Sequence, residues 1–223
     1  MMRTERCSTL ETVTPPGESD RRGTFLAIGS LCWIVAAIGY FLFEAVAAAA
    51  VEPAYGYATD YISPLGVPGR SPNAVLINAA FVTQAVLFPA GAALVVRGVA
   101  ARKASWFLAL AAVNGLGNVL VAIVHSGTGS KWHVAGAILA IAGGNAAVLV
   151  GLSVLRRAGA SRPYRAVSVG LGALGLLCLL ALAADTSHAV LPVGILERGS
   201  VYSIFVWQMV SAGYLVGSRA QRW

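Results

Sequence analysis

The sequence predicts an all-α integral membrane protein, a bundle of six transmembrane helices with both termini in the cytoplasm. Three observations predict it. Hydrophobic residues make up 57% of the 223-residue chain and charged residues only 11%, whereas soluble domains average about 25% charged residues. The apolar residues form six long stretches, and most basic residues lie on one side of them. A chain with this composition needs lipid as the solvent for much of its surface.

The polar segment before the first apolar stretch predicts a disordered cytoplasmic tail over residues 1–23. It carries mixed charges and the run Pro15-Pro16-Gly17, and such a composition buries too little apolar surface to fold. A six-helix transmembrane domain follows over residues 24–217. Residues 218–223 are expected to form a short cytoplasmic C-terminal tail.

Each apolar stretch is long enough to cross a bilayer. About 19 residues, at about 1.5 Å per residue, span roughly 30 Å of hydrocarbon. Helices are expected because every backbone amide within the membrane needs a partner in its own segment. The six predicted spans cover residues 24–51, 73–96, 104–124, 132–155, 166–184 and 199–217.

The basic residues predict the orientation. Thirteen of the 16 Lys and Arg residues lie on one side of the predicted spans, and Arg70, Lys131 and Arg198 lie on the other. Because cytoplasmic loops carry the excess of Lys and Arg, both termini are predicted to be cytoplasmic. The Ala- and Gly-rich composition is typical of a high-GC genome and suggests a bacterial plasma membrane. The net charge of +7 does not indicate nucleic-acid binding, because the basic residues lie beside the spans.

Small residues predict close helix packing. Gly136, Ala140 and Gly144 recur at every fourth position of one span, and Gly213 and Gly217 do so on another. This spacing lets helices approach closely. Ordinary packing within the chain is the favoured interpretation, and a helix–helix oligomer or a partner membrane protein is the alternative.

Polar residues gather on the predicted outer side, and each has an ordinary structural interpretation such as a cap, a turn or a bond between helices. Glu44 is harder to explain in this way because it lies within a span, where an ionisable group is costly and usually faces a partner. Arg70 and Arg198 are its candidate partners. The outer polar residues are Glu44, Asp60, Ser63, Arg70, Asn73, Asn78, His125, His133, Asp185, His188, Glu197 and Arg198.

The three histidines suggest a zinc site as an alternative. Three imidazoles can hold Zn²⁺ and leave a position for water, whose proton a carboxylate accepts. The candidate ligands are His125, His133 and His188, and the candidate bases are Glu44, Asp60 and Asp185. Their spacing matches no zinc motif, so we expect no cofactor. No nucleotide-binding or serine-hydrolase motif is present either.

Several short segments resemble the bacterial and archaeal membrane family called domain of unknown function 998. They are the stretch from Asp60 to Gly66, the stretch from His133 to Ala137, the Gly143-Gly144-Asn145 run, and Glu197-Arg198 with Tyr202 and Trp207. The resemblance covers about residues 25–217 and implies about six helices. It also implies that a set of polar residues belongs to the family pattern, without giving them roles: Asp60, Ser63, His133, Asn145, Glu197 and Arg198. His125 and His188 lie outside that pattern.

No motif fixes a reaction, so the first hypothesis is a non-catalytic protein. It would bind a lipid headgroup or small amphiphile in a polar pocket that opens outward. An enzyme acting on a lipid or terpenoid, through zinc or through Glu44 as an acid, is the second hypothesis. A structural or regulatory subunit that packs through Gly213 and Gly217 is the third. The predicted ligand-binding residues are Asp60, Ser63, Arg70, His133, Asn145, Glu197 and Arg198.

Overall fold

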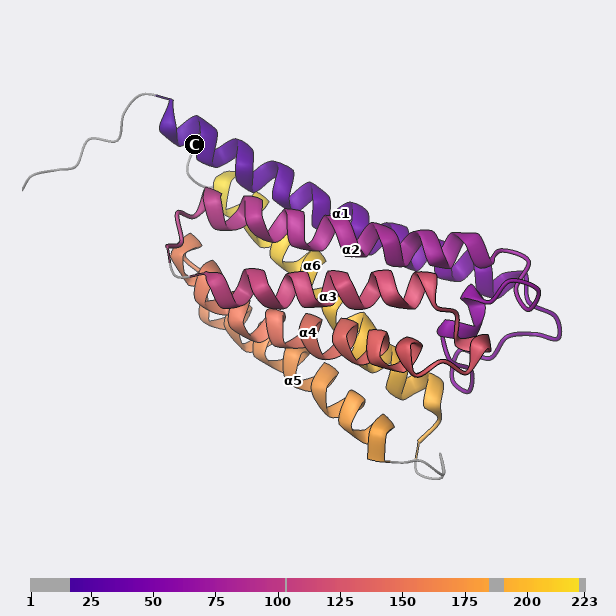
Figure 1. The fold of residues 1–223 in the computed structure, drawn as a ribbon. Coiled ribbons are helices and arrows are strands. Elements are labelled where there is room, and N and C mark those ends of the chain that lie inside the picture. The colour runs from indigo at the N-terminus through magenta and orange to yellow at the C-terminus, as the bar shows by residue number, and fades with distance from the viewer. Residues whose placement is uncertain (1–16, 103, 185–190, 221–223) are drawn as a thin grey trace, which may run out of the picture.

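The computed structural model describes residues 17–102, 104–184 and 191–220. Within these residues the chain forms one bundle of six α-helices with no strand (Figure 1). Three short 3₁₀-helices lie between them: η1 (Ser63–Gly66), η2 (Ser126–Thr128) and η3 (Arg156–Ala158). The six α-helices are α1 (Glu18–Ala49), α2 (Ala74–Gly98), α3 (Ser105–Ile123), α4 (Lys131–Leu155), α5 (Arg162–Ala184) and α6 (Val193–Ala220).

The helix bounds correct the predicted tails. Helix α1 begins at Glu18, so residues 18–23 belong to the helix and not to a disordered tail, while residues 1–16 lie outside the described residues. Helix α6 reaches Ala220, so residues 218–220 are also helical. Helix α6 starts at Val193, six positions before the predicted span. The prediction began too late because the polar pair Glu197 and Arg198, which lies in the first turns of α6, was placed outside the span.

Among the residues that the structure describes, five helices, α1 to α5, are long and apolar enough to cross a membrane. Helix α6 is less apolar, and several of its polar side chains are buried, among them Ser200, Ser203, Gln208 and Ser211. The exposed face of α1, in contrast, carries Leu31, Val35, Ile38, Leu42 and Val46. Apolar side chains on the outside and polar ones inside are typical of a bundle whose surface meets lipid.

Each helix packs against its neighbour in the chain, and α6 returns to pack against α1. The start of α1 and the end of α6 lie at the same end of the bundle (Figure 1). We call it the terminal end. The opposite end carries η1, η2, the start of α6 and the connection over residues 50–73 (Figure 1). We call it the loop end.

Glycine allows α3 and α4 to pack backbone to backbone. A Cβ atom placed on Gly117 would lie 2.2 Å from the Ala140 amide nitrogen, and one on Gly136 would lie 3.1 Å from the Gly117 carbonyl oxygen. The small residues predicted to pack on the fourth span therefore serve packing within the chain. For Gly213 and Gly217, no described atom lies within 4 Å of such a Cβ.

Two apolar clusters fill the bundle. One contains Trp33 and Trp207, whose ring centroids are 5.2 Å apart, with Phe88 and Phe107 packed around them. The other lies nearer the loop end and contains Tyr40, Phe81 and Phe205, together with Ile62 and Leu65 of the loop. Loop residues thus form part of the second core, which fixes the loop over the helix ends.

Candidate functional site

A buried ion pair joins the first and last helices at the loop end. Glu44 of α1 is 1% exposed and Arg198 of α6 is 6% exposed. Arg198 Nη2 and Nε donate to the same carboxylate oxygen, Glu44 Oε1, at 2.9 and 3.1 Å. The second oxygen accepts the hydroxyl of Tyr202 at 2.9 Å. Of the two candidate partners of Glu44, Arg198 is therefore the one that pairs with it.

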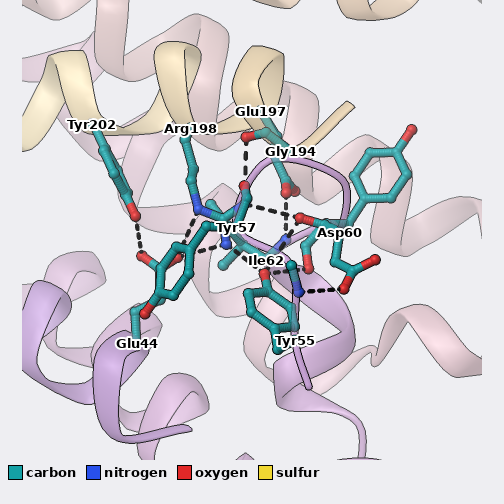
Figure 2. A network of polar contacts seen from close by, with 11 residues as sticks. Glu44, Tyr55, Tyr57, Asp60, Ile62, Gly194, Glu197, Arg198 and Tyr202 are labelled. Atoms are coloured by element: carbon teal, nitrogen blue, oxygen red, sulfur yellow. Dashed lines mark hydrogen bonds and ion pairs between the residues drawn. The ribbon is translucent and has the colours of Figure 1, made fainter. Parts of the chain in front are cut away.

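Arg198 also holds the loop between α1 and α2. Its Nη1 donates to the carbonyl oxygens of Tyr57 at 2.7 Å and Asp60 at 2.9 Å, and its Nη2 donates to the Tyr55 hydroxyl. The guanidinium carbon lies 4.8 Å from the Tyr57 ring centroid. Figure 2 shows Arg198 and Tyr202 projecting from α6 toward Glu44, with the loop beside them. All three guanidinium nitrogens therefore donate hydrogen bonds within the chain.

Two further bonds fix the same loop. The backbone amide of Ile62 donates to Glu197 Oε2, which ties the loop to α6 (Figure 2). Within the loop, the Gly56 amide donates to the Asp60 carboxylate at 2.8 Å. Asp60 therefore stabilises the loop, through its side chain and its carbonyl oxygen.

The loop tyrosines are held in their neutral form. Burial raises the pKa of Tyr55 to about 12, and the bond from Arg198 only partly offsets this. Burial also raises the pKa of Tyr57 and of Tyr61. A neutral phenol is what the geometry needs, because the Tyr55 hydroxyl donates to the Tyr61 carbonyl oxygen at 2.8 Å.

A small cavity lies beneath the ion pair and the loop, and we call it the inner cavity. Its volume is about 50 Å³, room for roughly three water molecules. Every α-helix except α5 contributes to its wall. The lining residues include polar ones, which are Tyr40, Ser63, Gln84, Asn114, Asn118, His133 and Glu197, and apolar ones, which are Ile62, Phe81, Val121, Ala137, Ala140, Ile141, Val201, Ile204 and Phe205.

Two polar atoms of the wall are buried without a hydrogen-bond partner: the Tyr40 hydroxyl and Gln84 Oε1. Each residue is 1% exposed. The orientation of the Gln84 amide follows from its neighbour. Asn114 Nδ2 donates to the Ala140 carbonyl oxygen at 2.6 Å, so Asn114 Oδ1 faces Gln84 and accepts from Gln84 Nε2 at 3.5 Å. Burying an unpaired polar group costs about 1–3 kcal/mol, so a partner that reaches either atom would be favoured.

His133 presents a basic nitrogen at the same cavity. Its Nδ1 lies 2.7 Å from the Val124 carbonyl oxygen. Since a carbonyl oxygen only accepts, Nδ1 carries the proton and Nε2 has a lone pair when the ring is neutral. Together with the Glu197 carboxylate and the oxygens of Gln84 and Asn118, the wall is rich in hydrogen-bond acceptors. None of the described lining residues is a Lys or Arg.

The predicted ligand-binding residues separate into four places. Ser63, His133 and Glu197 line the inner cavity, whereas Asp60 and Arg198 stabilise the loop. Arg70 lines a separate surface groove. Asn145 bonds helix to helix, since its Nδ2 donates to the Ser200 carbonyl oxygen at 2.8 Å and its Oδ1 accepts from Ser203 at 2.7 Å.

The predicted zinc site includes two residues that lie outside the described part of the chain. His188 and Asp185 lie outside the described residues. In residues 17–102, 104–184 and 191–220, no group of three His, Cys, Asp or Glu side chains is placed to hold a metal ion. His125 is not among the residues lining the inner cavity. The zinc site therefore remains a prediction.

Sequence reasoning missed the two unpartnered groups and the tyrosines of the loop end. Gln84 could have been recognised from the sequence, because it lies in the middle of a predicted span. A side-chain amide in that position needs a hydrogen-bond partner, and the same holds for Asn114. Tyr40, Tyr55 and Tyr57 offered none, because tyrosines are common at membrane interfaces. Only the folded loop brings Tyr55 and Tyr57 to Arg198.

Comparisons with known proteins identify the family. No curated protein and no solved structure matches the chain. The model of the family described as "Protein of unknown function (DUF998)" matches residues 34–214, which include all six helices in whole or in part and both Glu44 and Arg198. The match covers more than half of the chain, and the chain therefore belongs to this family of proteins of unknown function.

Proposed function

We propose that this protein crosses a bacterial plasma membrane six times and binds the polar head of a lipid or small amphiphile in the inner cavity. The observation that carries the proposal is the pair of buried, unpartnered groups in the wall, the Tyr40 hydroxyl and Gln84 Oε1. Apolar side chains in the same wall, such as Phe81 and Ile204, suit the start of a hydrocarbon chain.

The chemistry of the wall favours a head that donates hydrogen bonds. Glu197, Gln84 and His133 offer acceptors, and the rings of Tyr40, Phe81 and Phe205 add faces that attract a cation. Arg198, expected from the sequence to meet an anionic group, is occupied by Glu44, and Arg70 lies elsewhere. An ammonium or hydroxyl head of about three or four heavy atoms matches the volume of about 50 Å³.

Charge supports the proposed topology, in which α6 is the sixth span. Its 28 residues are long enough to cross the membrane, and its buried serines and Gln208 avoid lipid. The basic Arg97 lies in the last turn of α2, and Arg156 and Arg157 follow α4, which puts all three at the terminal end, on the cytoplasmic side by the positive-inside rule.

The topology predicts that reporter domains fused to residue 1 and to residue 223 both report the cytoplasm. A matched fusion inside the loop, after Gly69, should report the outside. Gly69 suits the insertion because it lies in an exposed turn. Opposite locations for the two termini would contradict six spans.

Removing the Tyr40 hydroxyl should weaken binding strongly without harming the fold. In Tyr40→Phe the ring stays stacked on Phe205, whose centroid is 4.1 Å away, while the unpaired hydroxyl is lost. We expect unchanged or slightly higher stability and at least tenfold weaker binding. The measurement compares the thermal stabilisation of purified protein by a long-chain alkylamine, an alkyl diol and an alkyl carboxylate. The amine or the diol should stabilise the wild type, and the carboxylate should not.

Tyr164→Phe is the matched control, because the Tyr164 hydroxyl bonds Ser211 at 2.8 Å and lies away from the inner cavity. It should lower stability and leave binding unchanged. Equal stabilisation of wild type and Tyr40→Phe by all three amphiphiles would refute the proposal. Recovery of a chemically altered amphiphile would instead favour the enzyme hypothesis.

A further inference from the structure

The residues that line the inner cavity differ in exposure according to the element that carries them. Four lining residues keep part of their surface: Ser63 of η1, Ala137 of α4, and Glu197 and Val201 of α6. We call the boundary between α4 and α6 beside these four residues the lateral opening. The lining residues of α1, α2 and α3, in contrast, are all buried. They are Tyr40, Phe81, Gln84, Asn114, Asn118 and Val121.

The side of α4 that faces α6 changes in exposure along the helix. Asn145 is 0% exposed and bonds α6 there, at Ser200 and Ser203. Ile138 and Val134 lie seven and eleven residues before Asn145, about two and three turns, so they project from the same side of α4. They are nevertheless 51% and 58% exposed. Helices α4 and α6 therefore touch at Asn145 and separate nearer the loop end.

Helix α5 covers the boundary between α4 and α6 only in the middle of the bundle. It lies against both helices at Gly175, where a Cβ atom would meet Asn145 and Ser203. Toward the loop end, α5 diverges from α4 (Figure 1). The exposure of Ile138 and Val134 is what this divergence leaves on α4.

The lateral opening faces lipid rather than water. Trp132, at the start of α4, is 68% exposed, and exposed tryptophans at helix ends are typical of the membrane interface. Ala137 lies five residues farther into α4, about 7.5 Å deeper at 1.5 Å per residue. Its exposed neighbours, Val134 and Ile138, are apolar. The lateral opening therefore lies at the depth where acyl chains begin.

An amphiphile with its head in the inner cavity needs an exit for its chain. The volume of about 50 Å³ holds a small polar head and no long hydrocarbon chain. The loop closes the route toward water, because Ile62 is 2% exposed and its amide is bonded to Glu197. Apolar surface in water also costs about 25 cal/mol per Å², so an exit into lipid is favoured.

We propose that the ligand of the inner cavity enters sideways from the outer leaflet through the lateral opening, and that its chain stays between Ala137 and Val201 when the head is bound. The inference rests on the proposed head-binding site and adds the route and a second subsite. The ligand class is then a lipid-dissolved amphiphile whose chain is attached directly to its small head.

The test photolabels the purified full-length protein with a long-chain alkylamine and an alkyl diol, each carrying a diazirine in the middle of its chain. Labelled residues are mapped by mass spectrometry, and the site is the labelling that an excess of the same amphiphile without diazirine removes. This labelling should fall on α4 and α6 beside the lateral opening, at residues such as Ala137, Ile138 and Val201. Tyr40→Phe should reduce it at least tenfold at subsaturating probe.

A larger side chain at Ala137 tests the same route by affinity. Ala137→Leu should narrow the lateral opening and weaken thermal stabilisation by the unlabelled amphiphile at least fivefold in apparent affinity. Ala112→Leu is the matched control, because it adds the same side chain on the exposed face of α3, two residues from Asn114 of the cavity wall. It should leave the affinity within twofold of the wild type.

The two proposals fail in different ways. Competed labelling that falls on the loop over residues 50–73, or an affinity within twofold of the wild type in Ala137→Leu, would overturn the lateral opening and leave the head site standing. Competed labelling that Tyr40→Phe does not reduce would overturn the head site, and this inference with it.

Discussion

Replacing Arg198 with methionine is expected to lower the free energy of unfolding by about 3–5 kcal/mol. The change leaves the Glu44 carboxylate buried with Tyr202 as its remaining hydrogen-bond donor. It also leaves the carbonyl oxygens of Tyr57 and Asp60 without the Arg198 donor that holds the loop. Chemical unfolding of the purified protein in mild detergent measures the loss.

A double variant separates the lost charge pair from the lost side-chain volume. Glu44→Gln combined with Arg198→Met removes both charges, and an uncharged replacement of a buried pair is often close to neutral. We expect the double variant to recover more than half of the stability lost by Arg198→Met. A cost of less than about 1 kcal/mol for Arg198→Met, typical of an exposed ion pair, would contradict the buried pair.

Adding one methyl group at Gly117 is expected to cost about 3 kcal/mol, at the upper end of what overpacking a core costs. The new Cβ of Gly117→Ala would lie 2.2 Å from the Ala140 nitrogen and 2.6 Å from the Gly136 carbonyl oxygen. Both atoms belong to the backbone of α4, so no side chain can rotate away. Helices α3 and α4 must then separate, which also widens the inner cavity. Thermal unfolding in detergent measures the change.

Gly213→Ala provides the matched control, since nothing described lies within 4 Å of its new Cβ. Alanine favours the helix over glycine by up to about 1 kcal/mol, so this variant should be as stable as the wild type or slightly more stable. If Gly117→Ala and Gly213→Ala changed the stability equally, the close backbone contact between α3 and α4 at Gly117 would be contradicted.

Much of the fold could be predicted from the sequence, because a bilayer restricts the length and the polarity of every segment that crosses it. An uninterrupted apolar stretch such as 105–123 has to be helical in a membrane, and its predicted bounds agree with α3 to within one residue. The predicted bounds of the sixth span, 199–217, agreed less well with those of α6, Val193–Ala220. Its first turns contain Glu197 and Arg198, and only their partners in α1 and the loop explain why charged residues belong to that helix.

The candidate site was less predictable, because burial depends on which side chains meet in three dimensions. The cost of an ionisable group in a span pointed to Glu44 and to Arg198 as a candidate partner. Spacing along the chain does not reveal that Arg198 is wholly occupied, or that Asn145 bonds to α6 rather than facing a ligand. The surroundings of Tyr40 come from α2, through Phe81, and from α6, through Tyr202 and Phe205, and no local sequence pattern predicts them.

An experimental density map of the protein in lipid nanodiscs tests the central claim most directly. The account predicts density for a molecule other than water in the inner cavity, within hydrogen-bond distance of the Tyr40 hydroxyl and Gln84 Oε1. A collapsed cavity, in which those two groups bond to each other or to ordered water alone, would contradict it.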